Sequence, residues 1–185
     1  MAEELSTREK LIIAGMDDIR FHGVQGFSLR RAAAACGVSC AAPYKHFADK
    51  YELFMAMIDY VGDQWASRLK EMSFKGMRPD EAIADSACEY LRFLNDNPHF
   101  HAMLLLNEAL TEDANRARIT NLSVPVKRAF VCYARDRGLT RQALRERVFT
   151  VRSLVLGAAL IMSSDGPGVE PRLSTLRASV LKALE

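Results

Sequence analysis

The chain has 185 residues, of which 49% are hydrophobic and 26% charged, and its formal net charge at pH 7 is +2. This length suits one compact body, or a small head and a larger core that share a helix. No stretch approaches the roughly 20 apolar residues of a membrane span, and the N-terminal sequence MAEELSTREK is too acidic and polar for a signal peptide. We therefore expect a soluble, cytoplasmic protein with no membrane partner.

Two short helices joined by a glycine turn are predicted early in the chain. Ser28 is a good N-cap for a helix over residues 29–36, and Gly37 supplies a residue that tolerates a left-handed conformation after it. Ser39 caps a second helix only two residues later, and so short a connection makes the two helices cross sharply. The alanines at 32–35 permit a close crossing. This pattern is typical of a helix-turn-helix that reads DNA.

A third helix is predicted to begin near Lys50. Asp49 and Glu52 have the spacing of a capping box, so residues 44–46 end the second helix. Lys50 then lies in the first turn of the third helix, where a phosphate meets both the ammonium and the positive end of the helix dipole.

Positive charge is concentrated on this segment. Arg30, Arg31, Lys45 and Lys50 stand against Asp49 alone, whereas the rest of the chain is close to neutral. Such a segment suits a nucleic-acid surface. Charge by itself would describe a solvated helix face equally well.

Residues 8–53 resemble the DNA-binding domain of the TetR family of bacterial transcriptional regulators. The resemblance rests on an opening helix with REKLIIAG, the turn GVQGFS, the junction A-x-x-C-G-V-S and the ending Y-x-H-F followed by Asp49-Lys50. It covers about a quarter of the chain, and its spaced features agree in order.

The resemblance implies a DNA-binding domain over residues 1–50 and a helical ligand-binding and dimerisation domain over residues 51–185. Residues 39–46 correspond to the recognition helix, in which Lys45 reads a guanine edge together with Arg30 from the preceding helix. Tyr44, His46 and Lys50, with Ser28, correspond to phosphate contacts, and the small residues 41–43 offer apolar contacts. The expected DNA-binding residues are Ser28, Arg30, Ser39, Cys40, Ala41, Ala42, Pro43, Tyr44, Lys45, His46 and Lys50.

The sequence departs from the family at two positions. Ala32 stands where a larger aliphatic residue is usual, so another side chain must fill that part of the core. Pro43 stands where leucine is frequent and removes one early hydrogen bond of the second helix, which changes the surface offered to DNA. Phe47 is expected to be a core residue and not a base stacker.

The remaining sequence is helical throughout. One long amphipathic helix is predicted from Leu53 to Met72 and another from Pro79 to about Asn95. Further helices are expected over about residues 98–110, over 112–137 with a kink or break near Pro125, over 140–163, and after the segment DGPGVEP. No β-alternation and no repeat is found, so the predicted fold is all-α.

The last two predicted helices carry long apolar stripes. A chain of this size would struggle to bury them alone, and such stripes usually mark an oligomer interface. The resemblance implies a homodimer formed through a four-helix bundle. The expected interface residues are Leu144, Val148, Val151, Val155, Ala158, Met162, Leu173, Leu176, Val180 and Leu184.

A small hydrophobic effector is expected in the larger domain, because large apolar side chains there are accompanied by few polar ones. For any single residue, solid packing is the alternative. The expected pocket residues are Trp65, Tyr90, Phe93, Phe100, His101, Met103, Asn107, Glu108, Tyr133, Phe149, Arg152 and Leu156.

No enzyme motif, cofactor motif or metal-ligand pattern stands out. The sequence has no G-x-G-x-x-G, P-loop, H-E-x-x-H or G-x-S-x-G. Cys36 and Cys40 flank the turn and suggest a thiol sensor or half of a zinc site, but buried cysteines in an alanine-rich corner are commoner.

We therefore predict a dimeric repressor that binds a palindromic operator in double-stranded DNA and is released by a small molecule. A helical ligand-binding or protein-interaction module without specific DNA function is the alternative, and a helical enzyme is a more distant one.

Overall fold

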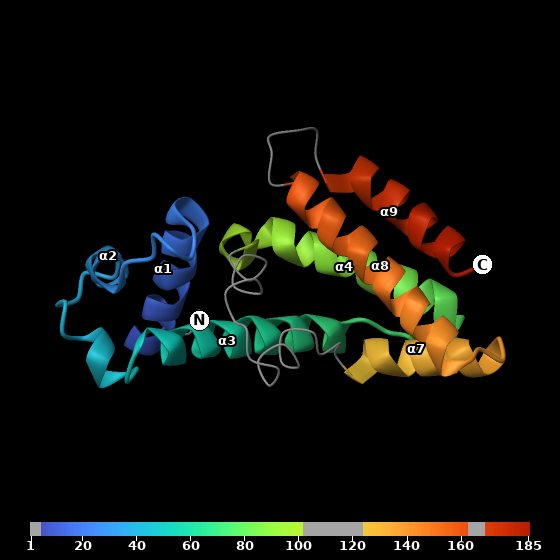
Figure 1. Ribbon diagram of the computed structural model, residues 1–185, viewed down its shortest axis with the longest axis horizontal. Helices are drawn as coiled ribbons and strands as arrows, with labels where there is room; N and C mark the ends of the chain where they lie inside the picture. The colour runs from blue at the N-terminus through green and yellow to red at the C-terminus, as the bar shows by residue number, and fades with distance from the viewer. Residues whose placement is uncertain (1–4, 102–123, 163–168) are drawn as a thin grey trace. The chain divides into compact units, whose positions relative to one another are not determined.

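The computed structural model describes residues 5–101, 124–162 and 169–185, and these residues form helices and no strand (Figure 1). The prediction of an all-α fold is therefore confirmed for the described part of the chain. The helices are α1 (Thr7–His22), α2 (Leu29–Ala35), η1 (Pro43–Lys45), α3 (Lys50–Glu71), α4 (Pro79–Asp96), η2 (Pro98–His101), α7 (Val124–Asp136), α8 (Arg141–Met162) and α9 (Val169–Ala183).

The described residues fall into two compact units. The first unit contains residues 5–64 and 98–101, and the second contains residues 65–97, 124–162 and 169–185. The helix α3 runs through both units, as the shared helix of the sequence analysis does. The predicted domain boundary at residue 50 stays a prediction.

The first unit is built on capped helices around a small apolar core. Ser6 caps α1, since its hydroxyl accepts from the backbone N–H of Glu9 while the Glu9 carboxylate accepts from the backbone N–H of Ser6. Asp49 caps α3 by accepting from the backbone N–H of Glu52 at 2.8 Å, so α3 begins at Lys50 as predicted. The fully buried core side chains here are Leu11, Ile12, Met16, Ile19, Ala33, Leu53 and Met57.

This core includes Ala32, one of the two departures from the family pattern. Ala32 is buried, and Phe47 is a core residue as expected, with 2% of its surface exposed. Gly15 is buried on α1, where a Cβ atom would collide with the terminal methyl group of the flexible Met57 side chain.

The predicted helix over residues 39–46 is wrong in type and length. The structure has a single 3₁₀ turn, Pro43–Lys45, between the α2 helix and α3. Pro43 has no N–H to donate to the carbonyl of Ser39, and the turns here are closed by bonds from Ala42 to Ser39 and from Lys45 to Ala42.

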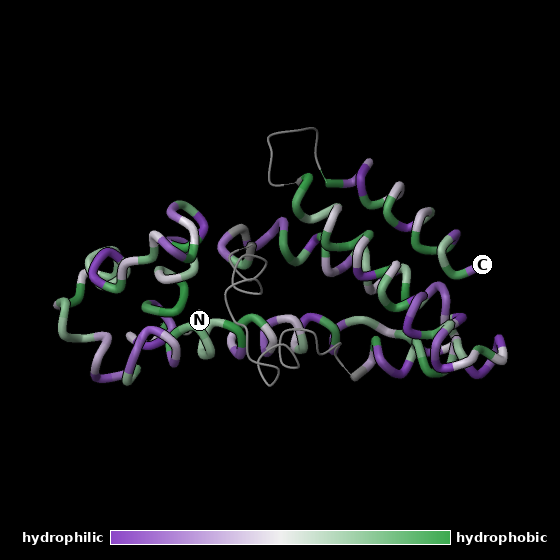
Figure 2. The backbone as a smooth tube through the Cα atoms, viewed as in Figure 1, coloured by the Kyte–Doolittle hydropathy of each residue, from purple (hydrophilic) through white to green (hydrophobic). Residues whose placement is uncertain are grey.

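The second unit is a layer of helices packed on α4. The helix α4 contacts α7, α8 and α9, and α8 contacts α9. Hydrophobic and hydrophilic residues alternate along these helices (Figure 2). The large buried residues of α4 are Ile83, Leu91, Phe93 and Leu94. Pro125 lies in the first turn of α7, and the helix predicted over residues 98–110 and the start of the one over 112–137 lie largely outside the described residues.

Much of the stripe assigned to a dimer interface lies inside the second unit. The residues of that stripe that the chain itself buries are Val151, Val155, Leu173, Leu176, Val180 and Leu184. Leu144, Val148 and Ala158 are half-buried, and the side chain of Met162 lies outside the described residues. The chain itself covers the six buried side chains, because α4, α8 and α9 pack on one another, and their part in a dimer interface stays a prediction. The apolar side chains that α8 exposes are Phe149, Leu160 and Ile161.

Candidate nucleic-acid interface

The candidate DNA surface of the first unit is an exposed turn. Tyr44 is 65% exposed, and Lys45 and His46 beside it are also exposed. Pro43, in contrast, is buried, and the apolar contact to bases expected of it stays a prediction. The remaining residues of this turn are the exposed Ser39, Cys40 and Ala41 and the half-buried Ala42.

Pro43 explains why one side chain of this turn is buried and the next three are exposed. With φ fixed by its ring, Pro43 begins the 3₁₀ turn and directs its own side chain inward. The backbone N–H groups of His46 and Phe47 both donate to the Pro43 carbonyl at 2.9 Å, which holds Phe47 in the core. The side chains of Tyr44, Lys45 and His46 consequently face solvent between the buried Pro43 and the buried Phe47.

The α2 helix begins at Ser28, as predicted. The Ser28 hydroxyl accepts from the backbone N–H of Arg31 at 3.4 Å. Arg30 is exposed in the first turn of this helix, and among the described residues neither Arg30 nor Lys45 has an ion-pair partner. Both side chains are thus available to an anionic ligand.

Arg31 is different, although the sequence grouped it with the other cations. Its Nε donates to Oδ1 of Asp18 at 2.6 Å and a terminal nitrogen donates to Oδ2 at 3.0 Å. The same terminal nitrogen donates to the carbonyl of Gly26 at 2.5 Å. Arg31 is therefore paired within the first unit, and fewer unpaired cations lie on this surface than the sequence indicated.

Asp18 is the residue that sequence analysis missed. Its position on α1, ten residues before Ser28, gave no sign that its carboxylate would be buried beneath α2. Burial alone would raise the pKa of Asp18, but hydrogen bonds from Arg31 and from the backbone of Ser28, and the charges of Arg31 and His22, outweigh it and lower the pKa. The carboxylate is therefore ionised at neutral pH.

Lys50 lies at the start of α3, as predicted, but it is partly engaged within its own unit. Its ammonium donates to the carbonyl of Val24 at 3.3 Å and lies 5.0 Å from the ring of Phe27 and 5.2 Å from that of Phe54. Phe27 and Phe54 also pack edge to face. The Lys50 side chain thus contacts both the turn before α2 and the ring of Phe54 on α3, and it remains exposed.

The cysteines near this surface show no metal-site arrangement. Cys36 is half-buried and Cys40 exposed, and both thiols are free. Burial raises the pKa of the Cys36 thiol. No group of three or more metal-ligating side chains occurs within the described residues.

An aromatic cluster in the second unit brings together three of the expected effector-pocket residues. Trp65 contacts Tyr90 and Phe93, with ring centroids 5.0 and 5.4 Å apart, and Tyr90 stacks on Phe93 at 6.2 Å. Burial raises the pKa of the Tyr90 hydroxyl, and the charge of Arg152 from α8 opposes the rise. Arg152 therefore lies within electrostatic range of Tyr90, and the pocket stays a prediction.

The other expected pocket residues are distributed differently. Phe100 belongs to the first unit and packs on Tyr60 and His99. The Tyr133 hydroxyl donates to the carbonyl of Leu184 at 2.5 Å, which ties α7 to the end of α9. Phe149 is 72% exposed and Leu156 is half-buried. Met103, Asn107, Glu108 and the side chain of His101 lie outside the described residues.

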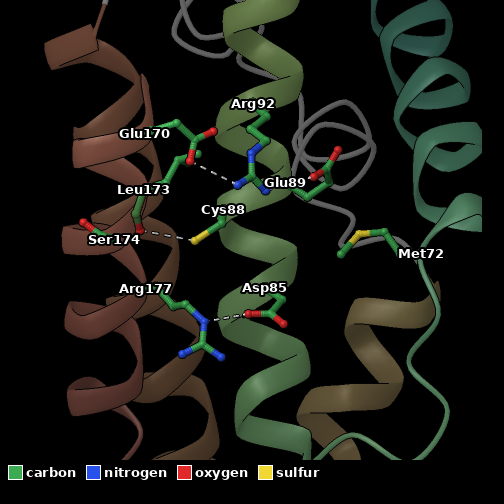
Figure 3. A pocket seen from close by; sticks show the side chains of 9 residues that line it. All are labelled: Met72, Asp85, Cys88, Glu89, Arg92, Glu170, Leu173, Ser174 and Arg177. Atoms are coloured by element: carbon green, nitrogen blue, oxygen red, sulfur yellow. Dashed lines mark hydrogen bonds and ion pairs between the residues drawn. The ribbon is translucent and has the colours of Figure 1, made fainter. Parts of the chain in front are cut away.

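A groove of about 410 Å³ lies between α4 and α9 in the second unit, and it is charged (Figure 3). At one end Arg177 Nε donates to Asp85 Oδ1 at 2.8 Å, and at the other Arg92 lies 3.5 Å from Glu170. The buried Cys88 thiol donates to the carbonyl of Leu173 between these pairs. The opposed charges at the two ends of the groove pair with each other.

Comparisons with known proteins agree with this fold. No family model matches the chain. The chain is 28% identical over 163 residues to the HTH-type transcriptional regulator CymR of Pseudomonas putida, which covers 84% of this chain and 79% of that protein.

Solved structures extend the likeness to nearly the whole chain. A TetR family transcription regulator from Marinobacter aquaeolei has a TM-score of 0.74 at 19% identity, covering 95% of this chain and 94% of its own. PfmR, a TetR family transcriptional regulator from Thermus thermophilus, has a TM-score of 0.71 at 20% identity, covering 95% and 99%. The chain therefore has the fold of TetR-family regulators, and the resemblance predicted from residues 8–53 is confirmed. No helix of the described residues is long and apolar enough to cross a membrane.

Proposed function

We propose that this chain, with the fold of the TetR-family regulators, is a DNA-binding transcriptional regulator of that family. The observation that carries the proposal is the exposed turn of Tyr44, Lys45 and His46, which follows the capped α2 helix with its exposed Arg30. Two cations that lack ion-pair partners in the described part of the chain, together with an exposed phenol hydroxyl, suit the phosphates and base edges of DNA.

Selection from randomised DNA duplexes by the purified protein, followed by fluorescence anisotropy, tests this function. We expect a palindromic site bound at least about a thousandfold more tightly than random duplex, which is the lower range for specific regulators. A protein that binds all duplexes equally would contradict specific regulation and would favour a helical ligand-binding or protein-interaction module.

We propose further that the regulator is a cytoplasmic repressor released by a small hydrophobic effector, and not an enzyme. The aromatic cluster of Trp65, Tyr90 and Phe93, with Arg152 near the Tyr90 hydroxyl, supports an apolar site with a polar end. Because an effector shifts the protein only by binding one state better, operator DNA must weaken effector binding by the same factor that effector weakens DNA binding.

Calorimetric titration of a lipophilic ligand, with and without operator present, tests this coupling. The ligand is first identified by mass spectrometry of whatever co-purifies with the protein. Equal affinities in the two titrations would contradict release by that ligand.

A homodimer completes the proposal, because a palindromic operator requires two heads. The support is the apolar side chains that α8 exposes, with Phe149 at 72% and Leu160 at 56%. The proposed interface thus includes the exposed face of α8 that carries Phe149 and Leu160. The half-buried Leu144, Val148 and Ala158 lie on the other apolar stripe of α8, with Val151 and Val155.

A further inference from the structure

The charge network around Asp18 joins three segments of the first unit. Both oxygens of its carboxylate are used, one by Arg31 Nε and the other by a terminal nitrogen of Arg31 and by the backbone N–H of Ser28 at 2.7 Å. Nδ1 of His22 lies 3.3 Å from Oδ1. The side chain of Asp18 is 6% exposed, so these donors replace water almost completely.

The α2 helix has little else to fix its position. It has seven residues, LRRAAAA, and its buried side chains are those of Ala32 and Ala33. A helix this short is marginal by itself, and two buried alanines contribute far less apolar area than leucines would. The polar network therefore adds fixed contacts to a helix that buries little apolar surface.

The network also holds the chain on both sides of Arg30, a candidate DNA-contacting residue of α2. Asp18 holds the backbone of Ser28 and the guanidinium of Arg31, and Arg30 lies between these two attachment points. Arg31 adds a bond to the carbonyl of Gly26, which fixes the turn before the helix. A shift of the helix start would move Ser28 and Arg30 together.

We infer that Asp18 and Arg31 are a positioning pair that sets where Ser28 and Arg30 meet DNA. The inference rests on the proposed DNA-binding function. Neither residue of the pair touches DNA in this assignment; the pair acts through the start of α2. The strength of a hydrogen bond falls sharply when its distance or angle departs from the optimum. A helix start that is free to move therefore weakens a bidentate base contact more than it weakens phosphate contacts made elsewhere.

The test compares operator and random-duplex affinities of Asp18→Asn and Arg31→Lys with those of the wild type. Asparagine still accepts from Ser28 but loses the charge partner of Arg31, while lysine keeps the charge but lacks the two-pronged geometry. We expect each to reduce the ratio of operator to random affinity by about tenfold, the loss of one base contact. Binding to random duplex should change less than about threefold, because the phosphate contacts remain.

Asp85→Asn is the matched control. Asp85 pairs with Nε of Arg177 at 2.8 Å between two helices of the second unit, so its loss resembles that of Asp18 in chemistry but lies outside the first unit. We expect it to lower the melting temperature without changing the ratio of affinities.

Amide exchange separates positioning from unfolding. Binding is measured where circular dichroism shows the variants folded, and exchange at residues 28–33 should rise in Asp18→Asn while α3 stays protected. If Asp18→Asn does not fold, the affinity ratio of Arg31→Lys alone decides the positioning role. The Arg31 side chain is 47% exposed, so its replacement by lysine leaves no cavity. An unchanged affinity ratio in a folded variant overturns the positioning role, whereas a wild type that binds no preferred duplex overturns the proposed function itself.

Discussion

At the scale of single residues, some basic side chains of the first unit are paired within it, and others are exposed without an ion-pair partner among the described residues. Arg30 and Arg31 are adjacent in sequence, yet only Arg31 reaches a buried carboxylate, because Asp18 lies under the start of α2. Lys50 has an intermediate position, exposed but held by a carbonyl and two rings. The residues free to meet phosphates and bases are fewer than the basic residues of the segment.

Acid should destabilise the protein through Asp18. Because its folded-state pKa is below the ordinary value of 3.8, the carboxylate contributes stability above that value and loses it as pH falls through the folded-state pKa. We expect the urea midpoint of the wild type to drop between about pH 5 and pH 3, and the drop to be smaller in Asp18→Asn, whose side chain does not titrate. Equal slopes for the two proteins would show that other carboxylates govern acid unfolding.

Lys45 and Lys50 should differ in their effects on DNA binding. Lys45→Ala should cost roughly 1 to 3 kcal/mol on operator and relax preference at one base pair, while Lys50→Ala should weaken all sequences alike and lower the salt slope by about one. Since Lys50 also fastens Val24 and two rings, only its variant should lower the melting temperature. Lys182→Ala, a change on α9 in the second unit, is the control. Equal losses on operator and random DNA for Lys45→Ala would contradict its base-reading role.

At the scale of helices and turns, the candidate recognition segment is set by one proline. Pro43 ends the bonding pattern that would extend a helix from Ser39, and its ring is buried while the three residues after it are exposed. The segment is therefore a compact 3₁₀ turn held between α2 and α3.

Pro43→Ala should restore a donor at this position and let the turn wind toward an α-helix. We expect a small gain in helical circular dichroism and a changed preferred duplex, because Tyr44, Lys45 and His46 would rotate relative to the core. Loss of the buried ring should also lower stability, by about 1 kcal/mol. An unchanged preferred sequence would show that the exposed residues do not depend on the turn type.

At the scale of the whole molecule, the two faces of α8 have separate tasks. One face carries Val151 and Val155 into the core of the second unit, and the other exposes Phe149 and Leu160.

Two charge insertions distinguish these faces. Phe149→Glu should leave the monomer folded and shift the molar mass measured by light scattering toward that of a monomer, with loss of operator affinity. Val180→Glu should instead unfold the protein or lower its stability by several kcal/mol, since Val180 is fully buried. A dimer that survives Phe149→Glu would place the interface elsewhere.

Helix boundaries set by capping residues could be predicted, and tertiary charge pairing could not. Ser28, Asp49 and the periodic apolar residues after it act locally, so the starts of α2 and α3 were predicted correctly. The pairing of Asp18 with Arg31 depends on how α1 crosses α2, and the burial of Val155 and Val180 depends on which helices cover each other. Apolar stripes predict that a face is covered but not what covers it. The effect of Pro43 was underestimated, because the short segment had no periodic apolar face to hold it helical.

The two ion pairs that flank the charged groove specify the direction of α9. On α4 the acid Asp85 precedes the base Arg92 by seven residues, and on α9 the acid Glu170 precedes the base Arg177 by the same interval. Because the helices run antiparallel, every acid meets a base. If α9 docked in the reverse direction, Asp85 would face Glu170 and Arg92 would face Arg177, with like charges together at both ends. These four side chains therefore favour the observed direction of α9 over the inverted topology.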